Sequence, residues 1–188
     1  MAIQKHLNDS VYLNDGNWDD LRVAAQNTRI NPVKEKPDYG SLTGAFLTYL
    51  FDPAETETVN FVIQIPHSFK YNSTIYPHVH WAPVTASSGS VRWSFEYSIA
   101  NIFGTFGAAT TLTALCEASG TAYKHFYCSL GSIDMSGFST SCMILCNLSR
   151  LGNGSGDDYP SDAGLLEFDI HYQKNCIGSD NELNKSWE

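Results

Sequence analysis

Hydrophobic and polar positions alternate along several stretches of the chain, most clearly in SVRWSFEYSI (residues 90–99) and LLEFDIHYQ (residues 165–173). Successive side chains of a β-strand point to opposite faces of a sheet, so this two-residue period predicts strands with one buried face. The apolar positions are Val91, Trp93, Phe95, Tyr97 and Ile99 in the first stretch and Leu166, Phe168, Ile170 and Tyr172 in the second. We expect Trp93, Phe95 and Phe168, together with Trp81, to form the core.

The same period recurs from residue 43 onward and predicts eight strands. Turn-forming residues separate them, as in DPAE, SSG and ASG. No stretch in this region shows a convincing amphipathic helix. The predicted strands are residues 43–51, 58–65, 74–84, 91–99, 110–117, 123–130, 141–148 and 165–173. This pattern predicts an all-β fold, a two-sheet antiparallel β-sandwich of the jelly-roll type.

Residues 1–40 lack this regular alternation, and we expect them to form an extended N-terminal arm ahead of the sandwich domain of residues 41–188. The stretch NWDDLRVAAQNTR could form one short helical turn, and the prolines that follow it would end any helix. Trp18 and Leu21 are unfavourable in contact with water. The arm is therefore either a flexible leader or a segment that docks on a neighbouring subunit.

The charge of the chain argues against one class of partner. It has 11 Lys and Arg residues against 20 Asp and Glu residues, and a formal net charge of −9. Proteins that bind nucleic acid cluster Lys and Arg against the phosphates, so we expect no nucleic-acid partner. No run approaches the ~20 apolar residues of a membrane-spanning helix, so we expect no membrane association.

The five cysteines are odd in number and irregularly spaced, and the N-terminal stretch MAIQKHLNDSVYLNDG has no apolar run typical of a secretory signal. Disulfides are rare in the reducing cytoplasm. We therefore expect free, mostly buried thiols in a protein that is assembled in a cytoplasm. The cysteines are Cys116, Cys128, Cys142, Cys146 and Cys176.

The stretch YPHVHW (residues 76–81) places two histidines on one face of a predicted strand. Side chains two residues apart on a strand can chelate one metal ion. However, no carboxylate follows His78 and His80 before Glu96, and two imidazoles alone make an incomplete catalytic centre. His171 could supply a third nitrogen, or three copies of the strand could share one ion on a threefold axis. We expect histidines that are hydrogen-bonded to neighbouring strands or stacked on aromatic side chains at a subunit contact, with no metal.

No catalytic constellation is present in the sequence. GSIDMSGFSTS contains serines without the GxSxG pattern of a nucleophile elbow, and GNGSGDD lacks the GK[ST] ending of a phosphate-binding loop. The acidic stretches DGNWDD and GSGDDYPSD lack the ligand spacing of a calcium loop, and solvated turns explain them better. We therefore expect no catalytic residue, no cofactor and no enzyme activity.

Five motifs, read in order, resemble a known group of proteins. They are Trp18–Arg22 (WDDLR), Pro77–Trp81 (PHVHW), Trp93–Tyr97 (WSFEY), Phe168–Tyr172 (FDIHY) and the Gly178–Ser179 pair. In this order the chain is similar to small virion-associated structural proteins of tailed bacteriophages. The resemblance implies a non-enzymatic homotrimer located in the virion, where it contacts major capsid or tail proteins. Its role would be capsid decoration or cementing, or that of a head fibre, tail fibre or adaptor.

Two alternative functions remain open at the level of the sequence. Jelly rolls often bind sugars through exposed aromatic side chains, so the chain could be a receptor-recognition module for a glycan. The tyrosines available for this purpose are Tyr71, Tyr76, Tyr123 and Tyr159. The other alternative is a cupin-like metalloenzyme that uses His78, His80 and His171.

Overall fold

The computed structural model describes residues 4–5 and 11–185, which are almost entirely β-strand. No helix in these residues is long and apolar enough to cross a membrane. The short 3-10 helix η1 spans Ala25–Asn27. The strands are β1 Gln4–Lys5, β2 Val11–Ala24, β3 Arg29–Ile30, β4 Asp38–Thr43, β5 Phe46–Phe51, β6 Thr56–Gln64, β7 Thr74–Pro83, β8 Ser88–Ala100, β9 Thr110–Ser119, β10 Phe126–Ser129, β11 Ile133–Asp134, β12 Met143–Leu151 and β13 Ala163–Cys176.

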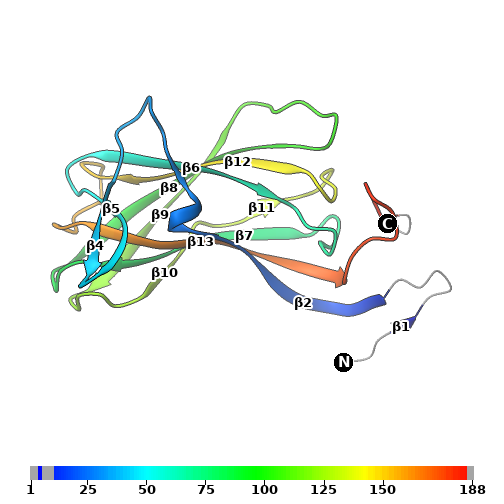
Figure 1. Ribbon diagram of the computed structural model, residues 1–188, viewed down its shortest axis with the longest axis horizontal. Coiled ribbons are helices and arrows are strands. Elements are labelled where there is room, and N and C mark those ends of the chain that lie inside the picture. The colour runs from blue at the N-terminus through cyan, green and yellow to red at the C-terminus, as the bar shows by residue number, and fades with distance from the viewer. Residues whose placement is uncertain (1–3, 6–10, 186–188) are drawn as a thin grey trace.

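The strands form two antiparallel sheets. In the first sheet β2 pairs with β13, β13 with β7, and β7 with β10, while the β4–β5 hairpin continues from one end of β13. The second sheet has the order β3-β6-β12-β8-β9. Figure 1 shows β6 and β12 in one layer and β7, β13 and β2 in the other.

The order in which the chain visits the two sheets is that of a jelly roll. It runs through β2 in the first sheet, β6 in the second, β7 in the first, and β8 and β9 in the second. It then returns to the first sheet with β10, the second with β12 and the first with β13. Apart from the additional strands β1, β3, β4, β5 and β11, four strands of each sheet are joined in the eight-stranded double Greek key of a jelly roll. The predicted fold class is confirmed, and each of the eight predicted strands overlaps an observed one.

The inward faces of both sheets form one aromatic core. Trp81, Trp93, Phe95 and Phe168, which the alternation assigned to the core, are all fully buried. The ring centroids of Phe95 and Phe168 lie 4.7 Å apart across the two sheets, and those of Trp81 and Trp93 lie 6.4 Å apart. Burial of each such side chain stabilises the fold by roughly 1.5–3 kcal/mol, so the facing aromatic surfaces hold the two layers together.

A register shift in β13 changes one detail of the predicted pattern. The pairing of β13 with β7 is irregular between Leu165 and Glu167, as in a β-bulge. Leu165 is therefore the fully buried residue at this point, and Leu166 is only partly buried. Beyond the bulge the predicted alternation holds, so Asp169 lies on the face opposite the core-facing Phe168 and Ile170.

The N-terminal segment differs from the predicted arm. Residues 11–24 form β2, which pairs with β13 along most of its length, so the predicted division at residue 40 separates strands of the same sheet. Leu21 lies opposite Ile170 and packs against the core. The ring of Trp18 contacts that of Tyr76, with centroids 5.7 Å apart and planes tilted by 60°. Both residues therefore have partners within their own chain. The expected helical turn is limited to η1 because β2 continues through most of that stretch.

The expectation that all five thiols are free is wrong for two of them. Cys116 of β9 and Cys128 of β10 form a disulfide, with Cα atoms 5.7 Å apart. β9 and β10 are the last strands of their respective sheets at the same edge of the sandwich, which is why residues of different sheets meet there. Among the described residues, Cys142, Cys146 and Cys176 are free and buried.

Candidate functional site

The outer face of the first sheet carries the histidine pair. His78 and His80 leave β7 on the face opposite the buried Val79 and Trp81, and their Nε2 atoms lie 3.1 Å apart. The ring of Tyr127, from the neighbouring β10, lies 4.6 Å from that of His78. Neighbouring side chains therefore cover His78 completely, although it points away from the core.

A carboxylate completes the pair. Asp169 of β13 lies directly opposite His78, and its Oδ2 is 3.4 Å from His78 Nε2 and 3.9 Å from His80 Nε2. Asp169 is only 4% exposed, and no donor in the described part of the chain reaches its Oδ1. Asp169 was not predicted from the sequence, because no carboxylate follows the histidine pair closely along the chain and sheet pairing supplies one from the neighbouring strand.

His171 lies beside this cluster without completing it. Its ring centroid is 4.3 Å from that of His78, but its Nε2 is directed at Asp20, with Oδ1 3.3 Å away. The side chains of His171 and Asp20 are 41% and 47% exposed, so this is a surface pair. His171 thus groups with Asp20 and with Asp169, whose carboxylate also faces His78 and His80.

His80 stands between the buried cluster and solvent. Its Nδ1 lies 2.7 Å from Nε2 of the exposed His125. Burial lowers the pKa of His80, and the neighbouring His78 and His125 lower it further, against the carboxylates of Asp169 and Glu167, which raise it. A cavity of about 330 Å³ opens beside it, lined by Asp20, Arg22, His80, His125, Leu166, Glu167 and Asp169.

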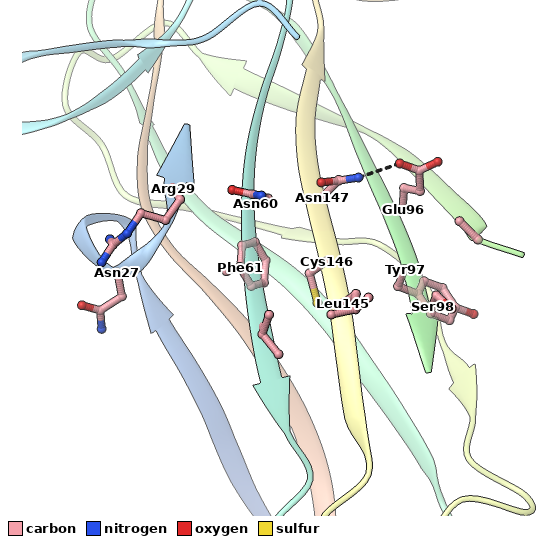
Figure 2. Close-up of a pocket in the computed structure, with 12 residues that line it drawn as sticks. Asn27, Arg29, Asn60, Phe61, Glu96, Tyr97, Ser98, Leu145, Cys146 and Asn147 are labelled. Atoms are coloured by element: carbon pink, nitrogen blue, oxygen red, sulfur yellow. Dashed lines mark hydrogen bonds between the residues drawn. The ribbon is translucent and has the colours of Figure 1, made fainter. Parts of the chain in front are cut away.

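The outer face of the second sheet carries a larger hollow, a groove of about 650 Å³. Its most regular feature is a row of polar side chains that crosses the strands at one level (Figure 2). Strand pairing places these residues directly opposite one another, one from each successive strand. In the order β3, β6, β12 and β8 they are Arg29, Asn60, Asn147 and Glu96.

The polar row offers both donors and acceptors. Asn147 Nδ2 donates to Glu96 Oε2 at 2.8 Å, which fixes the orientation of both side chains. Oδ1 of Asn60 is buried without a hydrogen-bond donor among the described residues. Arg29 donates through Nη1 to the carbonyl oxygen of Thr28 at 3.0 Å. Because buried polar atoms are normally hydrogen-bonded, the acceptor on Asn60 indicates a place where a ligand or water supplies a donor.

Apolar side chains border the row on one side. Val62 of β6 and Leu145 of β12 are paired neighbours and are 50% and 42% exposed. Tyr97 of β8, which is partly buried and packs against the core, also lines the groove. The groove therefore combines a flat apolar strip with a line of planar polar groups, the mixture that small-ligand sites use for contact area and orientation.

The four tyrosines considered for sugar binding lie elsewhere. Tyr159 is fully buried and its hydroxyl bonds to Thr85, and Tyr71 is partly buried beside Phe69. Tyr76 and Tyr123 are 38% and 52% exposed. None of the four lines the groove, which the sequence could not reveal because its residues come from strands far apart in the chain.

Comparison with known proteins yields similarity in structure alone. No family model and no curated protein matches the sequence. A CBM22-1–GH10 fragment of xylanase 10B from Clostridium thermocellum has a TM-score of 0.37 and 9% identity, over 83% of this chain and 28% of that one. The module TmCBM61, in complex with β-1,4-galactotriose, has a TM-score of 0.33 and 12% identity, over 84% and 88%.

A phage protein is also among the similar structures. The enzymatically active domain of tailspike protein 4 of bacteriophage CBA120 has a TM-score of 0.32 and 8% identity, over 86% of this chain and 19% of that one. The chain thus spans less than a third of the xylanase and tailspike chains it matches. These similarities concern the β-sandwich fold.

Proposed function

We propose that the chain is a carbohydrate-binding module, and that the groove on the second sheet is its binding site. The observation that carries this proposal is the polar row of Arg29, Asn60, Asn147 and Glu96 beside an exposed apolar strip. A sugar hydroxyl both donates and accepts, and the row offers a guanidinium donor, a carboxylate acceptor and two amides that do both. Together with the resemblance to virion proteins, this supports receptor recognition by a phage particle.

The size of the row fits an oligosaccharide. Neighbouring strands lie about 4.8 Å apart, so a row across four strands spans about 14 Å. The hydrogen bond between Asn147 and Glu96 holds the β12–β8 end of the row in place before a ligand arrives. Less conformational entropy is then lost on binding than with mobile side chains.

The groove supports binding better than hydrolysis. Glycoside hydrolases generally use two carboxyl groups on either side of the scissile bond. Among the described residues that line the groove, Glu96 is the one carboxylate, and it is held by Asn147. We therefore assign recognition, without a catalytic role, to this surface.

A glycan array of bacterial cell-surface oligosaccharides and common plant and animal glycans tests the proposal. We expect the wild type to bind a subset of these glycans, and the Asn147→Ala and Glu96→Gln variants to bind them at least about tenfold more weakly, since each loses a hydrogen bond to the ligand. Glu117→Gln is the matched control, because Glu117 is an exposed glutamate of the same sheet outside the groove. The absence of binding to every glycan, or equal loss in the control, would refute the proposal.

A homotrimeric structural role in the virion is the second candidate. It is favoured by the β4–β5 hairpin, where Tyr39, Phe46 and Leu47 are 52%, 76% and 47% exposed. Adjacent exposed apolar residues of this kind mark surfaces that another protein covers. The resemblance to trimeric virion proteins suggests a second copy of the chain as that protein, with capsid or tail proteins as further partners.

The mass of the protein in solution tests this candidate. Light scattering after gel filtration should give a trimer for the wild type and a smaller species for the Phe46→Ser/Leu47→Ser variant. Val33→Ser is the control, because Val33 is 86% exposed but lies outside the hairpin. A monomeric wild type, or a trimer that survives the hairpin variant, would contradict it.

A further inference from the structure

Three potential ligand atoms converge on one point at the outer face of the first sheet. They are Nε2 of His78, Nε2 of His80 and Oδ2 of Asp169, separated by 3.1, 3.4 and 3.9 Å. Ligands on a tetrahedral ion with bonds of about 2.0–2.1 Å lie about 3.3 Å from one another. The three atoms therefore already have nearly the spacing of three vertices of a metal coordination sphere.

Hydrogen bonds on the far sides of the rings direct both Nε2 lone pairs inward. Nδ1 of His78 lies 3.3 Å from the carbonyl oxygen of Tyr76, which can only accept, so the proton of His78 belongs on Nδ1. Nδ1 of His80 lies 2.7 Å from Nε2 of His125, which can accept its proton. Outer partners of this type fix the tautomer of histidines that bind metals.

The carboxylate of Asp169 requires a positive partner. It is 4% exposed, its Oδ1 has no donor among the described residues, and His78 Nε2 is the nearest nitrogen to Oδ2. If Nε2 of His80 instead donated a proton to Nε2 of His78, both His78 Nε2 and Asp169 Oδ2 would be acceptors, and Oδ2 would receive no hydrogen bond from His78. Burial of a charge costs several kcal/mol unless an opposite charge compensates it. A cation at the point of convergence satisfies all three atoms.

We propose that His78, His80 and Asp169 form a mononuclear site for a divalent transition-metal ion of the Zn²⁺ type. Two imidazoles and one carboxylate suit zinc and its first-row neighbours, whereas Mg²⁺ and Ca²⁺ prefer oxygen ligands alone. Three protein ligands leave one coordination position unfilled. His80, whose side chain is 23% exposed, and Asp169 both line the cavity described above, so an ion and a fourth ligand can reach the cluster from there.

The burial of His78 determines how many chains can share one ion. Because neighbouring strands of its own chain cover it completely, His78 cannot share an ion with two further copies on a threefold axis. The site is therefore complete within one chain and holds one ion per chain. It also links β7 to β13 at the centre of the first sheet, so binding of the ion stabilises the folded state.

Metal titration of the full chain, first stripped with a chelator, tests the site. After addition of Zn²⁺ and gel filtration, elemental analysis should give one zinc per chain, and the thermal unfolding midpoint should rise. Co²⁺ should give the visible absorption of an ion bound by nitrogen and oxygen. Asp169→Asn should weaken binding by more than the roughly 10–100-fold that loss of an outer partner costs.

The matched control is Asp134→Asn. Asp134 lies on β11, which pairs with β7, and its replacement removes the same charge, but its carboxylate accepts from Ser136 and belongs to neither the cluster nor the cavity beside His80. This variant should bind zinc like the wild type. If Asp169→Asn fails to fold, as judged by circular dichroism, His80→Gln gives the same test at a more exposed ligand. No zinc bound by the wild type, one zinc per three chains, or equal binding by both carboxyl variants would overturn the proposal.

Discussion

Arg150 and Asp157 form a bidentate ion pair in the interior, with side chains that are 0% and 1% exposed. Nε donates to Oδ2 at 3.0 Å and Nη2 donates to Oδ1 at 2.7 Å. The remaining N–H groups of the guanidinium donate to the carbonyl oxygens of Phe51, Ser161 and Tyr159. All five donors are used, so β12 is fixed to the loop that leads into β13 and to the end of β5.

This ion pair should make Arg150 one of the most sensitive polar residues of the fold. Arg150→Met leaves the carboxylate of Asp157 buried without its partner, and removal of one member of a buried pair costs about 3–5 kcal/mol. Arg22→Met is the control, because its ion pair with Glu167 is on the surface, where such pairs contribute at most about 1 kcal/mol. Urea unfolding of both variants measures the difference. Equal losses of unfolding free energy in the two variants would show that the buried ion pair stabilises the fold no more than the surface pair does.

The disulfide should stabilise the sandwich at the edge where the two sheets meet. Cys116 and Cys128 are 12 residues apart in sequence, and a loop of that length corresponds to about 3 kcal/mol. We expect the Cys116→Ser/Cys128→Ser variant to lose about this free energy of unfolding in an oxidising buffer. Under a reducing agent the wild type should lose the same amount and the variant should not change. A wild type that is insensitive to reduction would contradict the prediction.

The fold could be predicted from the sequence because the alternation of apolar and polar residues is a local signal. In the stretches around Trp93 and Phe95 and around Phe168, the polarity of each residue indicates whether its side chain lies on the buried or the exposed face of the strand. Residues 11–24 were missed because runs of consecutive polar residues, NDGN at 14–17 and DD at 19–20, interrupt the two-residue period in β2. Its strand conformation depends on the pairing with β13, a partner from the other end of the chain.

The candidate sites were harder to predict from the sequence because they consist of contacts between strands. His78 and His80 are adjacent in sequence and were found, whereas Asp169 reaches them through the pairing of β7 with β13. The disulfide was missed for the same reason, since its two strands belong to different sheets. Asp157 was assigned to a solvated turn, because nothing in the stretch GSGDDYPSD shows that Arg150 lies beneath it.

Gly152, which follows β12, should be intolerant of any side chain. A Cβ atom at this position would lie 2.3 Å from the carbonyl oxygen of Glu55 and 2.8 Å from those of Asp52 and Pro53. These are backbone atoms, so Gly152→Ala should force the two loops apart and cost about 2 kcal/mol or more. At Gly107 a Cβ atom would meet nothing within 4 Å, so Gly107→Ala should leave the unfolding midpoint nearly unchanged. Similar midpoints for both variants would contradict this close approach of the loops.

Glu57 should make the stability of the fold depend on pH near neutrality. The pKa of its carboxyl is raised to about 7, chiefly by burial. The negative charges of Asp52, Asp38 and Asp162 also act to raise it, and a hydrogen bond from Asp52 N acts to lower it. Between the ordinary value of 4.5 and about 7, the folded protein keeps a proton that the unfolded chain has released. The contribution of Glu57 to stability is therefore fully present below the lower value and is lost as the pH rises through the upper one.

Glu57→Gln should remove this dependence, because glutamine keeps the acceptor for Asp52 N and carries no charge. The variant should match the wild type near about pH 4 and exceed it near about pH 8 by on the order of 2 kcal/mol, since one pKa unit corresponds to about 1.4 kcal/mol and solvent screens part of the effect. Urea unfolding across this range measures the gap, with the exposed neighbour Glu55→Gln as the control. Other groups titrate in the same range, but they contribute equally to both proteins and cancel in the difference. A gap that stays constant with pH would mean that the pKa of Glu57 is the same in the folded protein and in the unfolded chain.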